Sequence, residues 1–142
     1  MNRLQTKVRE FNKVGGQYCA DGYGLPNLTS FANQLRFLRE EVDEMSDAYS
    51  SGDIMEVIDG AGDALYVLLH IFNQVGVDAD VVLDEIHRSN MSKFVLGDDG
   101  KTPEAIMKDG KIQKGPHYFK PRWDQYLPQA AYNYQEHIKE QE

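Results

Sequence analysis

Two groups of acidic residues stand on either side of a short turn, and they are the side chains best suited to chemistry. The first group is Glu40, Glu41 and Glu44, and the second is Asp59 and Asp63; we call these five residues the acidic cluster. Residues three or four positions apart share one face of a helix. Like charges at this spacing repel each other, so a folded protein tends to keep them where they bind a cation. All-oxygen ligands favour a hard cation, Mg²⁺ or Mn²⁺.

The turn between the two groups predicts that they converge. If two helices meet antiparallel about Ser51-Gly52-Asp53, residues equally far from the turn lie level with each other. At the usual helical rise, Glu44 is then level with Asp59, and Glu40 with Asp63. The spacing therefore predicts a single carboxylate site between two helices.

Apolar residues at helical spacing predict the helices that carry this site, and an all-α bundle of four to five helices. We expect helices over 3–14, from an N-cap at Thr29 or Ser30 to about Tyr49, over 54–75 between Asp53 and Gly76, and from Asp78 or Asp80 to about Ser92. The expected buried stripes are Phe31, Leu35, Leu38, Val42 and Met45 in the second helix, and Ile54, Ile58, Ala61, Leu65, Leu68, Leu69 and Phe72 in the third.

The C-terminal part of the chain follows a different pattern. Asp98-Asp99-Gly100-Lys101 and Lys108-Asp109-Gly110-Lys111 are Asp-Gly turns, which predict a basic loop or a small hairpin. The tail from Trp123 onward is rich in Tyr, Gln and Glu and is a candidate for a last helix. With 142 residues, we expect one domain over 1–142.

Composition narrows the function. The formal net charge of −8 argues against binding a nucleic-acid polymer, but single nucleotides arriving with metal ions stay possible. Cys19 is the one cysteine, so no disulfide framework is expected and a reducing cytoplasm is the natural location. The sequence has no run of 18 apolar residues and no apolar stretch of signal-peptide type near its start, so we expect no membrane span.

Four segments in order resemble a known superfamily: LREEVDE at 38–44, DGAGDALYV at 59–67, HRSNMSK at 87–93 and DGKIQKGP at 109–116. Together they resemble the all-α nucleoside triphosphate pyrophosphohydrolases, which include MazG-like proteins, dimeric dUTPases and phosphoribosyl-ATP pyrophosphohydrolases. The last two segments favour the MazG-like branch of bacteria and phages. The resemblance covers roughly 3–123, and residues 124–142 lie outside it. One position departs from the superfamily's second motif, which is usually Glu-x-x-Asp. Three positions before Asp63, where the glutamate is expected, this chain has Gly60. Asp59, one position earlier, is the first choice for the missing ligand, and Glu56 is the second choice.

The resemblance implies hydrolysis between the α- and β-phosphates of a nucleoside triphosphate, which yields a monophosphate and pyrophosphate. Attack on phosphorus needs a positioned water and cations on the phosphate oxygens, and carboxylates suit both tasks. Glu40 is the candidate that orients or deprotonates the water. The candidate ligands of Mg²⁺, or alternatively Mn²⁺, are Glu41, Glu44, Asp59 and Asp63.

Basic and polar residues complete the implied site. The candidates for binding the substrate's phosphates are Arg88, Asn90, Lys93, Lys111 and Lys114, although a basic helix C-terminus is also a common stabilising device. The resemblance also implies self-association as a homodimer or homotetramer.

Other side chains are weaker candidates. Gln17, Asn33 and Gln34 are able to read a base edge, and Tyr66 and His70 are more often neighbours of a site than catalysts.

The residues exclude three other enzyme classes and leave one alternative open. The Nudix pattern fails because Phe31 stands where its first glutamate belongs. A di-iron carboxylate bundle would need Glu-x-x-His and an HD-type phosphohydrolase would need His-Asp, and the sequence contains neither. A non-catalytic helical module that binds nucleotides or a partner through the same acidic groove stays an alternative.

Overall fold

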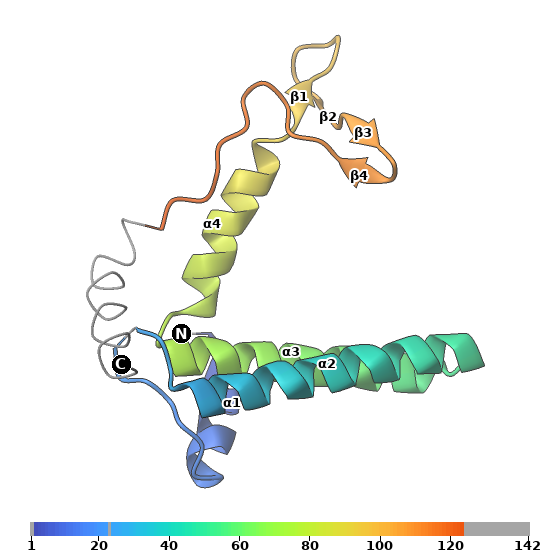
Figure 1. Ribbon diagram of the computed structural model, residues 1–142. Coiled ribbons are helices and arrows are strands. Elements are labelled where there is room, and N and C mark those ends of the chain that lie inside the picture. Colours follow the sequence, from blue (N-terminus) through green and yellow to red (C-terminus); the bar gives the residue numbers. More distant parts are fainter. Residues whose placement is uncertain (1, 23, 124–142) are drawn as a thin grey trace. The chain divides into compact units, whose positions relative to one another are not determined.

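The computed structural model describes residues 2–22 and 24–123, and these residues form four helices and four short strands (Figure 1). The helices are α1 (Arg3–Val14), α2 (Leu28–Ser51), α3 (Ile54–Val75) and α4 (Ala79–Met91). The predicted all-α class is confirmed. Among the described residues, no helix combines the length and the apolar character that crossing a membrane would require.

Side-chain caps explain where the helices begin. Asp53 accepts a hydrogen bond from the Glu56 amide at 3.1 Å and starts α3, as predicted. For α2 the predicted cap is wrong, because Asn27 accepts from the Ser30 amide at 2.9 Å and starts the helix earlier. Helix α4 begins directly after Asp78, one of its two predicted starting points.

A tight turn joins α2 to α3 and places them antiparallel. Gly52 ends α2 in the left-handed conformation, with φ of 75°, which glycine adopts without steric cost. Small buried residues, Ala48, Gly60 and Ala64, then let the helices approach closely. A Cβ atom at Gly60 would lie only 2.6 Å from Cγ of Met45. The hairpin therefore depends on small side chains at this contact.

The buried centre of this part of the chain is small and unusually polar. Val8, Leu69 and Ala79 form its apolar part, with Phe72 packed against them. Beside them Gln5 is fully buried; its amide nitrogen donates to Asn73 Oδ1 at 3.1 Å and to the Val77 carbonyl at 2.8 Å. Its amide oxygen accepts from the Ala79 amide at 2.8 Å. Paired amides thus hold α1 against the end of α3.

The predicted core face of α3 is wrong over most of the helix. Ile54, Ile58 and Leu65 are 65%, 59% and 48% exposed, and Leu68 is 40% exposed; of the predicted set, Leu69 and Phe72 do pack in the core. In α2 the predicted core residue Val42 is 50% exposed. The positions of α3 that face inward carry small or polar residues instead: Gly60, Ala64, His70, Asn73 and Gln74.

The described chain divides into two compact units between Ala79 and Asp80. The second unit contains two antiparallel strand pairs: β1 (Val95–Leu96) with β2 (Pro103–Glu104), and β3 (Met107–Lys108) with β4 (Lys111–Ile112). Asp109 and Gly110, with φ of 52° and 73°, form the two-residue turn of the second pair. The hairpin predicted from the Asp-Gly sequence is therefore confirmed.

Candidate functional site

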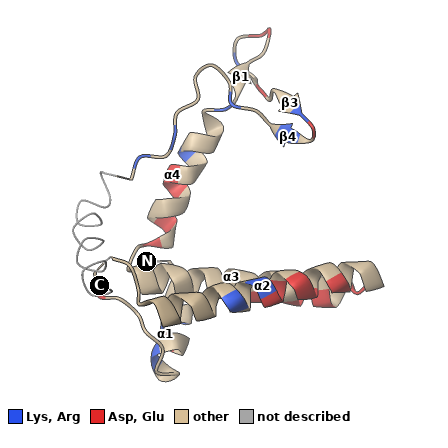
Figure 2. Ribbon diagram, viewed as in Figure 1, with Lys and Arg blue, Asp and Glu red and all other residues tan. Residues whose placement is uncertain are grey.

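The acidic cluster lies along the hairpin of α2 and α3, and Figure 2 shows acidic residues in the C-terminal half of α2. Glu41 is partly buried, whereas Glu40, Glu44, Asp59 and Asp63 are exposed. Burial raises the pKa of Glu41, and the charges of its neighbours, together with a side-chain hydrogen bond to Glu44, raise that pKa further. The neighbours are Glu44, Asp63 and Asp59, in decreasing order of Coulombic effect. The hairpin thus brings carboxylates from both helices within electrostatic reach of Glu41.

Glu41 has the chemistry of a cation ligand. Its Oε2 atom is buried and has no hydrogen-bond partner within the described part of the chain. A buried polar atom without a partner costs about 1–3 kcal/mol, and more if it is charged, and a bound cation would remove that cost. Across residues 2–22 and 24–123, no three His, Cys, Asp or Glu side chains are grouped closely enough to form a finished metal centre.

Position 60 explains how this chain departs from the superfamily's usual sequence. Gly60 faces α2, and a Cβ there would lie 2.6 Å from Met45 Cγ and 3.5 Å from the Glu41 carbonyl oxygen. A glutamate at this position would require the Met45 side chain or one of the two helices to move. Asp59, one residue earlier, is among the groups that raise the pKa of Glu41, and Glu56 is not.

Arg88, a predicted phosphate ligand, is engaged within the second unit. Its Nε and NH2 groups donate to the carboxylate of Glu85 at 2.9 and 2.7 Å, and its guanidinium lies 4.3 Å from the centre of the Phe119 ring. Glu85, 2% exposed, also accepts from the Arg122 amide at 2.6 Å. The Arg88 hydrogen bonds are the main cause that lowers the pKa of Glu85 to about 2, followed by the Arg122 amide. The pair therefore ties the segment around Phe119 to α4.

The other predicted phosphate ligands differ in exposure. Asn90 and Lys111 are exposed. Lys114 is exposed as well, and its ammonium lies 4.9 Å from the centre of the Tyr118 ring. Lys93 is partly buried, and its carbonyl accepts from the Gly115 amide at 3.1 Å. All of these residues belong to the second unit.

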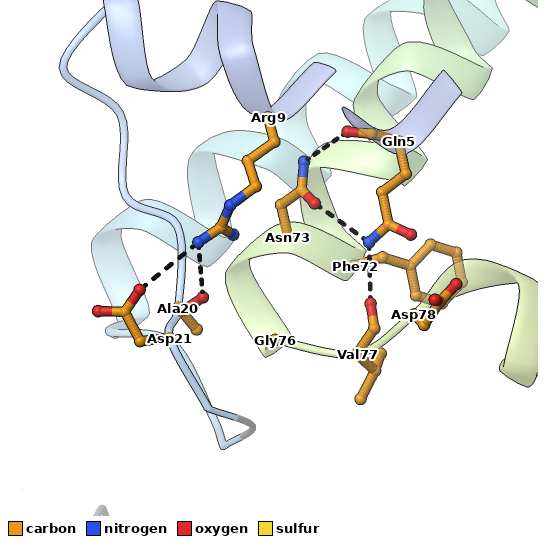
Figure 3. A pocket seen from close by; sticks show the side chains of 9 residues that line it. All are labelled: Gln5, Arg9, Ala20, Asp21, Phe72, Asn73, Gly76, Val77 and Asp78. Carbon is orange, nitrogen blue, oxygen red and sulfur yellow. Dashed lines mark hydrogen bonds and ion pairs between the residues drawn. The ribbon is translucent and has the colours of Figure 1, made fainter. Parts of the chain in front are cut away.

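A pocket of about 370 Å³ lies where α1, the loop after it and the end of α3 meet (Figure 3). Arg9 donates there to the Ala20 carbonyl at 3.2 Å and lies 3.6 Å from Asp21. The amides of Gln5 and Asn73 are hydrogen-bonded to each other and to the backbone. Because these polar groups hold protein segments together, this pocket has the character of a structural junction.

A second cavity, of about 320 Å³, has a different lining. It contains the three amides that the sequence suggested as base readers, together with His70 and one residue that the sequence reading missed, Gln74. His70 is 3% exposed, its Nε2 lies 3.3 Å from the Tyr18 carbonyl oxygen, and burial lowers its pKa. The full lining is Gly16, Gln17, Tyr18, Ser30, Asn33, Gln34, Phe37, His70 and Gln74.

One segment of the chain matches a known protein family. Residues 26–90 match the family model of phosphoribosyl-ATP pyrophosphohydrolase. An uncharacterized protein of Acanthamoeba polyphaga mimivirus is 34% identical over 79 residues, which cover 51% of this chain and 32% of that protein. The chain thus spans about a third of that relative's length. The family match includes the whole α2–α3 hairpin with its acidic cluster. Residues 26–90 are therefore similar to a family of the all-α nucleoside triphosphate pyrophosphohydrolase superfamily.

Proposed function

We propose that the protein is a Mg²⁺-dependent nucleoside triphosphate pyrophosphohydrolase that cleaves between the α- and β-phosphates. The observation that carries the proposal is Glu41, a partly buried carboxylate whose Oε2 atom is buried without a partner in the described chain, beside three neighbouring carboxylates. The matched family, by its name, is a pyrophosphohydrolase, which supports the same type of reaction.

The acidic cluster supplies the groups that this reaction requires. Glu41, Glu44, Asp59 and Asp63 would hold Mg²⁺ or Mn²⁺, and such an ion neutralises charge on the phosphate oxygens when bound. Without a cation these carboxylates would repel a triphosphate, so substrate binding and metal binding depend on each other. Glu40 is exposed on α2 next to Glu41, and we assign it the orientation or deprotonation of the attacking water.

Basic residues are assigned to the phosphates. Lys93, Lys111 and Lys114 carry the positive charge that a departing pyrophosphate requires, and Asn90 offers an exposed amide. We assign Arg88 to the phosphates as well, although it binds Glu85 through its Nε and NH2 groups.

Self-association is part of the proposal. Ile54, Met55 and Ile58 on α3 are 65%, 69% and 59% exposed, and Tyr49 on α2 is 82% exposed. Large apolar side chains grouped in this way mark interaction surfaces. We propose that a homodimer or homotetramer covers them.

One observation favours the alternative of a non-catalytic nucleotide-binding module: the carboxylates in the described part of the chain are not assembled into a finished metal centre. Such a module would bind nucleotides through the same groove without turnover. Turnover itself therefore separates the two functions.

The test is turnover of ribo- and deoxynucleoside triphosphates with and without a chelator, with products separated by ion-exchange chromatography. Wild-type protein should release monophosphate and pyrophosphate only with Mg²⁺. Glu41→Gln should lose about 100-fold or more in kcat/KM, since even the outer partners of metal ligands are worth 10–100-fold. Asp43→Asn is the control, because Asp43 is an exposed acid on the same helix outside the cluster. Equal activity of wild type and Glu41→Gln would refute the site.

A further inference from the structure

Two buried amide side chains at the second cavity lack the partners that a stable fold normally provides. Gln34 is 6% exposed and Gln74 is 1% exposed. Gln74 Oε1 has no hydrogen-bond partner in the described part of the chain, and Gln74 Nε2 makes only a long contact of 3.4 Å to the Ser30 carbonyl. Gln34 lines the same cavity and makes no side-chain hydrogen bond to the described residues, and its amide atoms are not fully enclosed. A buried polar oxygen without a partner, as at Gln74, destabilises a fold.

Gln5 shows that this chain pairs its other buried amides. It is as buried as Gln74 and makes three hydrogen bonds, to Asn73, Val77 and Ala79. At the cavity, Asn12 Nδ2 donates to Gln17 Oε1 at 2.8 Å. That bond fixes the Gln17 carbonyl, so that the Gln17 NH₂ group is available to donate. The unpaired oxygen of Gln74 and the amide of Gln34 therefore both lie in the lining of this cavity.

The lining defines the chemistry of the ligand. Phe37 and Tyr18 contribute aromatic rings, and the amides contribute both donors and acceptors. No charged residue is among the lining residues in the described chain, because burial favours the neutral form of His70. The guanidinium of Arg36 lies over the Phe37 ring at 4.9 Å and is not part of the lining. A planar, uncharged group with hydrogen-bonding edges fits this environment.

The cavity and the acidic cluster lie on the same face of α2 and on the same face of α3. Gln34 stands seven positions before Glu41 on α2, and His70 stands seven positions after Asp63 on α3. Residues seven apart return to nearly the same face, about 10 Å along the axis. Because α2 and α3 are antiparallel, both displacements run in the same direction. A ligand that occupies the cavity can therefore extend its other end toward the carboxylates.

We propose that this cavity binds the uncharged base of a nucleoside triphosphate, with Gln34 and Gln74 as specificity-determining residues. The inference rests on the proposed function, because the triphosphate would extend from the base to the acidic cluster. The inference also predicts that this chain does not prefer phosphoribosyl-ATP, the substrate in the name of the matched family. The base of phosphoribosyl-ATP carries a further phosphoribosyl group, and no residue of the described cavity lining offers a cation for that extra phosphate.

The first experiment compares Gln34→Met and Gln74→Met with Gln5→Met as a matched control. Methionine keeps the unbranched shape and removes the amide. For the cavity variants, the melting temperature should stay equal or rise by a few degrees, while KM for the preferred triphosphate rises about tenfold. For Gln5→Met the melting temperature should fall, with KM unchanged below that temperature. If Gln34→Met and Gln74→Met lower the melting temperature as Gln5→Met does and leave KM unchanged, these amides are structural and the inference is overturned.

A second measurement separates this inference from the proposed hydrolysis. Nucleosides without phosphates are titrated in EDTA while NMR follows the side-chain amide signals of Gln34 and Gln74. Shifts of these signals support the base site even if the protein hydrolyses nothing. Hydrolysis without such shifts, and with base preference unchanged in both variants, overturns the base site and leaves the proposed reaction intact. Among substrates, phosphoribosyl-ATP should have a kcat/KM at least tenfold below that of the best triphosphate; equal use would also contradict the inference.

Discussion

Glu41 is placed where its ionised form is costly, and the cation site that we propose rests on this placement. It is partly buried, its Oε2 atom lacks a partner in the described chain, and the carboxylates around it raise its pKa. Helical spacing was enough to predict that these carboxylates face one another. It did not predict the burial of the Oε2 atom, because that depends on how closely α3 approaches at Gly60.

Glu85 is a buried carboxylate whose pKa shifts in the direction opposite to that of Glu41. Arg88 and the Arg122 amide lower the pKa of Glu85 from 4.5 to about 2. The lowered pKa contributes stability that is complete above pH 4.5 and is lost as the pH falls toward 2. Glu85→Gln should therefore lower the melting temperature at pH 7, and the difference from wild type should shrink below pH 4.5. Circular dichroism melts from pH 7 to 2.5 measure this, and a difference that stays constant with pH would contradict the ion pair.

The role that we propose for Gln74 was beyond sequence reasoning at this scale. Gln74 lies four positions after His70 on the face of α3 that also carries Asp63, so helical spacing was the available signal. Spacing alone cannot show that an amide is buried without a partner. The engagement of Arg88 with Glu85 at the i, i+3 spacing was predictable, but its stacking on Phe119 joins segments that are distant in sequence.

Among the elements, the α2–α3 hairpin determines the geometry of the site, and Gly60 controls its width. Gly60→Ala would place a Cβ 2.6 Å from Met45 Cγ, and overpacking of this kind costs about 1–3 kcal/mol. We expect a lower melting temperature and at least a tenfold loss of kcat/KM, because the carboxylates of the two helices move apart.

Gly62→Ala is the matched control for this change. No atom lies within 4 Å of a Cβ at Gly62, and alanine favours a helix by about 1 kcal/mol over glycine. This variant should be more stable and fully active. Equal effects of the two substitutions would show that helix propensity, and not the spacing between the helices, explains the result for Gly60.

Element boundaries were more predictable than element faces. Asp53 and Gly76 bound α3 as predicted because caps act locally. The buried face of α3 was predicted from its largest apolar residues, yet small residues face α2 and leave Ile58 and Leu65 exposed. Periodicity identifies an apolar stripe, but it does not say whether the same chain or another covers it.

At the scale of the whole molecule, the exposed apolar side chains of α3 predict an oligomer. Ile58→Asp places a charge on this surface, where Ile58 is 59% exposed. We expect light scattering to show a homodimer or homotetramer for wild type and a smaller species for the variant. Leu96→Asp, in β1 with Leu96 64% exposed, is the control and should keep the wild-type mass. A monomeric wild-type protein would contradict the assignment.

In the proposed reaction, water attacks the α-phosphorus at the acidic cluster. The decisive test is hydrolysis of a triphosphate in ¹⁸O-labelled water with Mg²⁺ present, followed by ³¹P NMR and mass spectrometry of the products. We expect one labelled oxygen in the monophosphate and none in the pyrophosphate. Label in the pyrophosphate, or release of a diphosphate and inorganic phosphate, would contradict it.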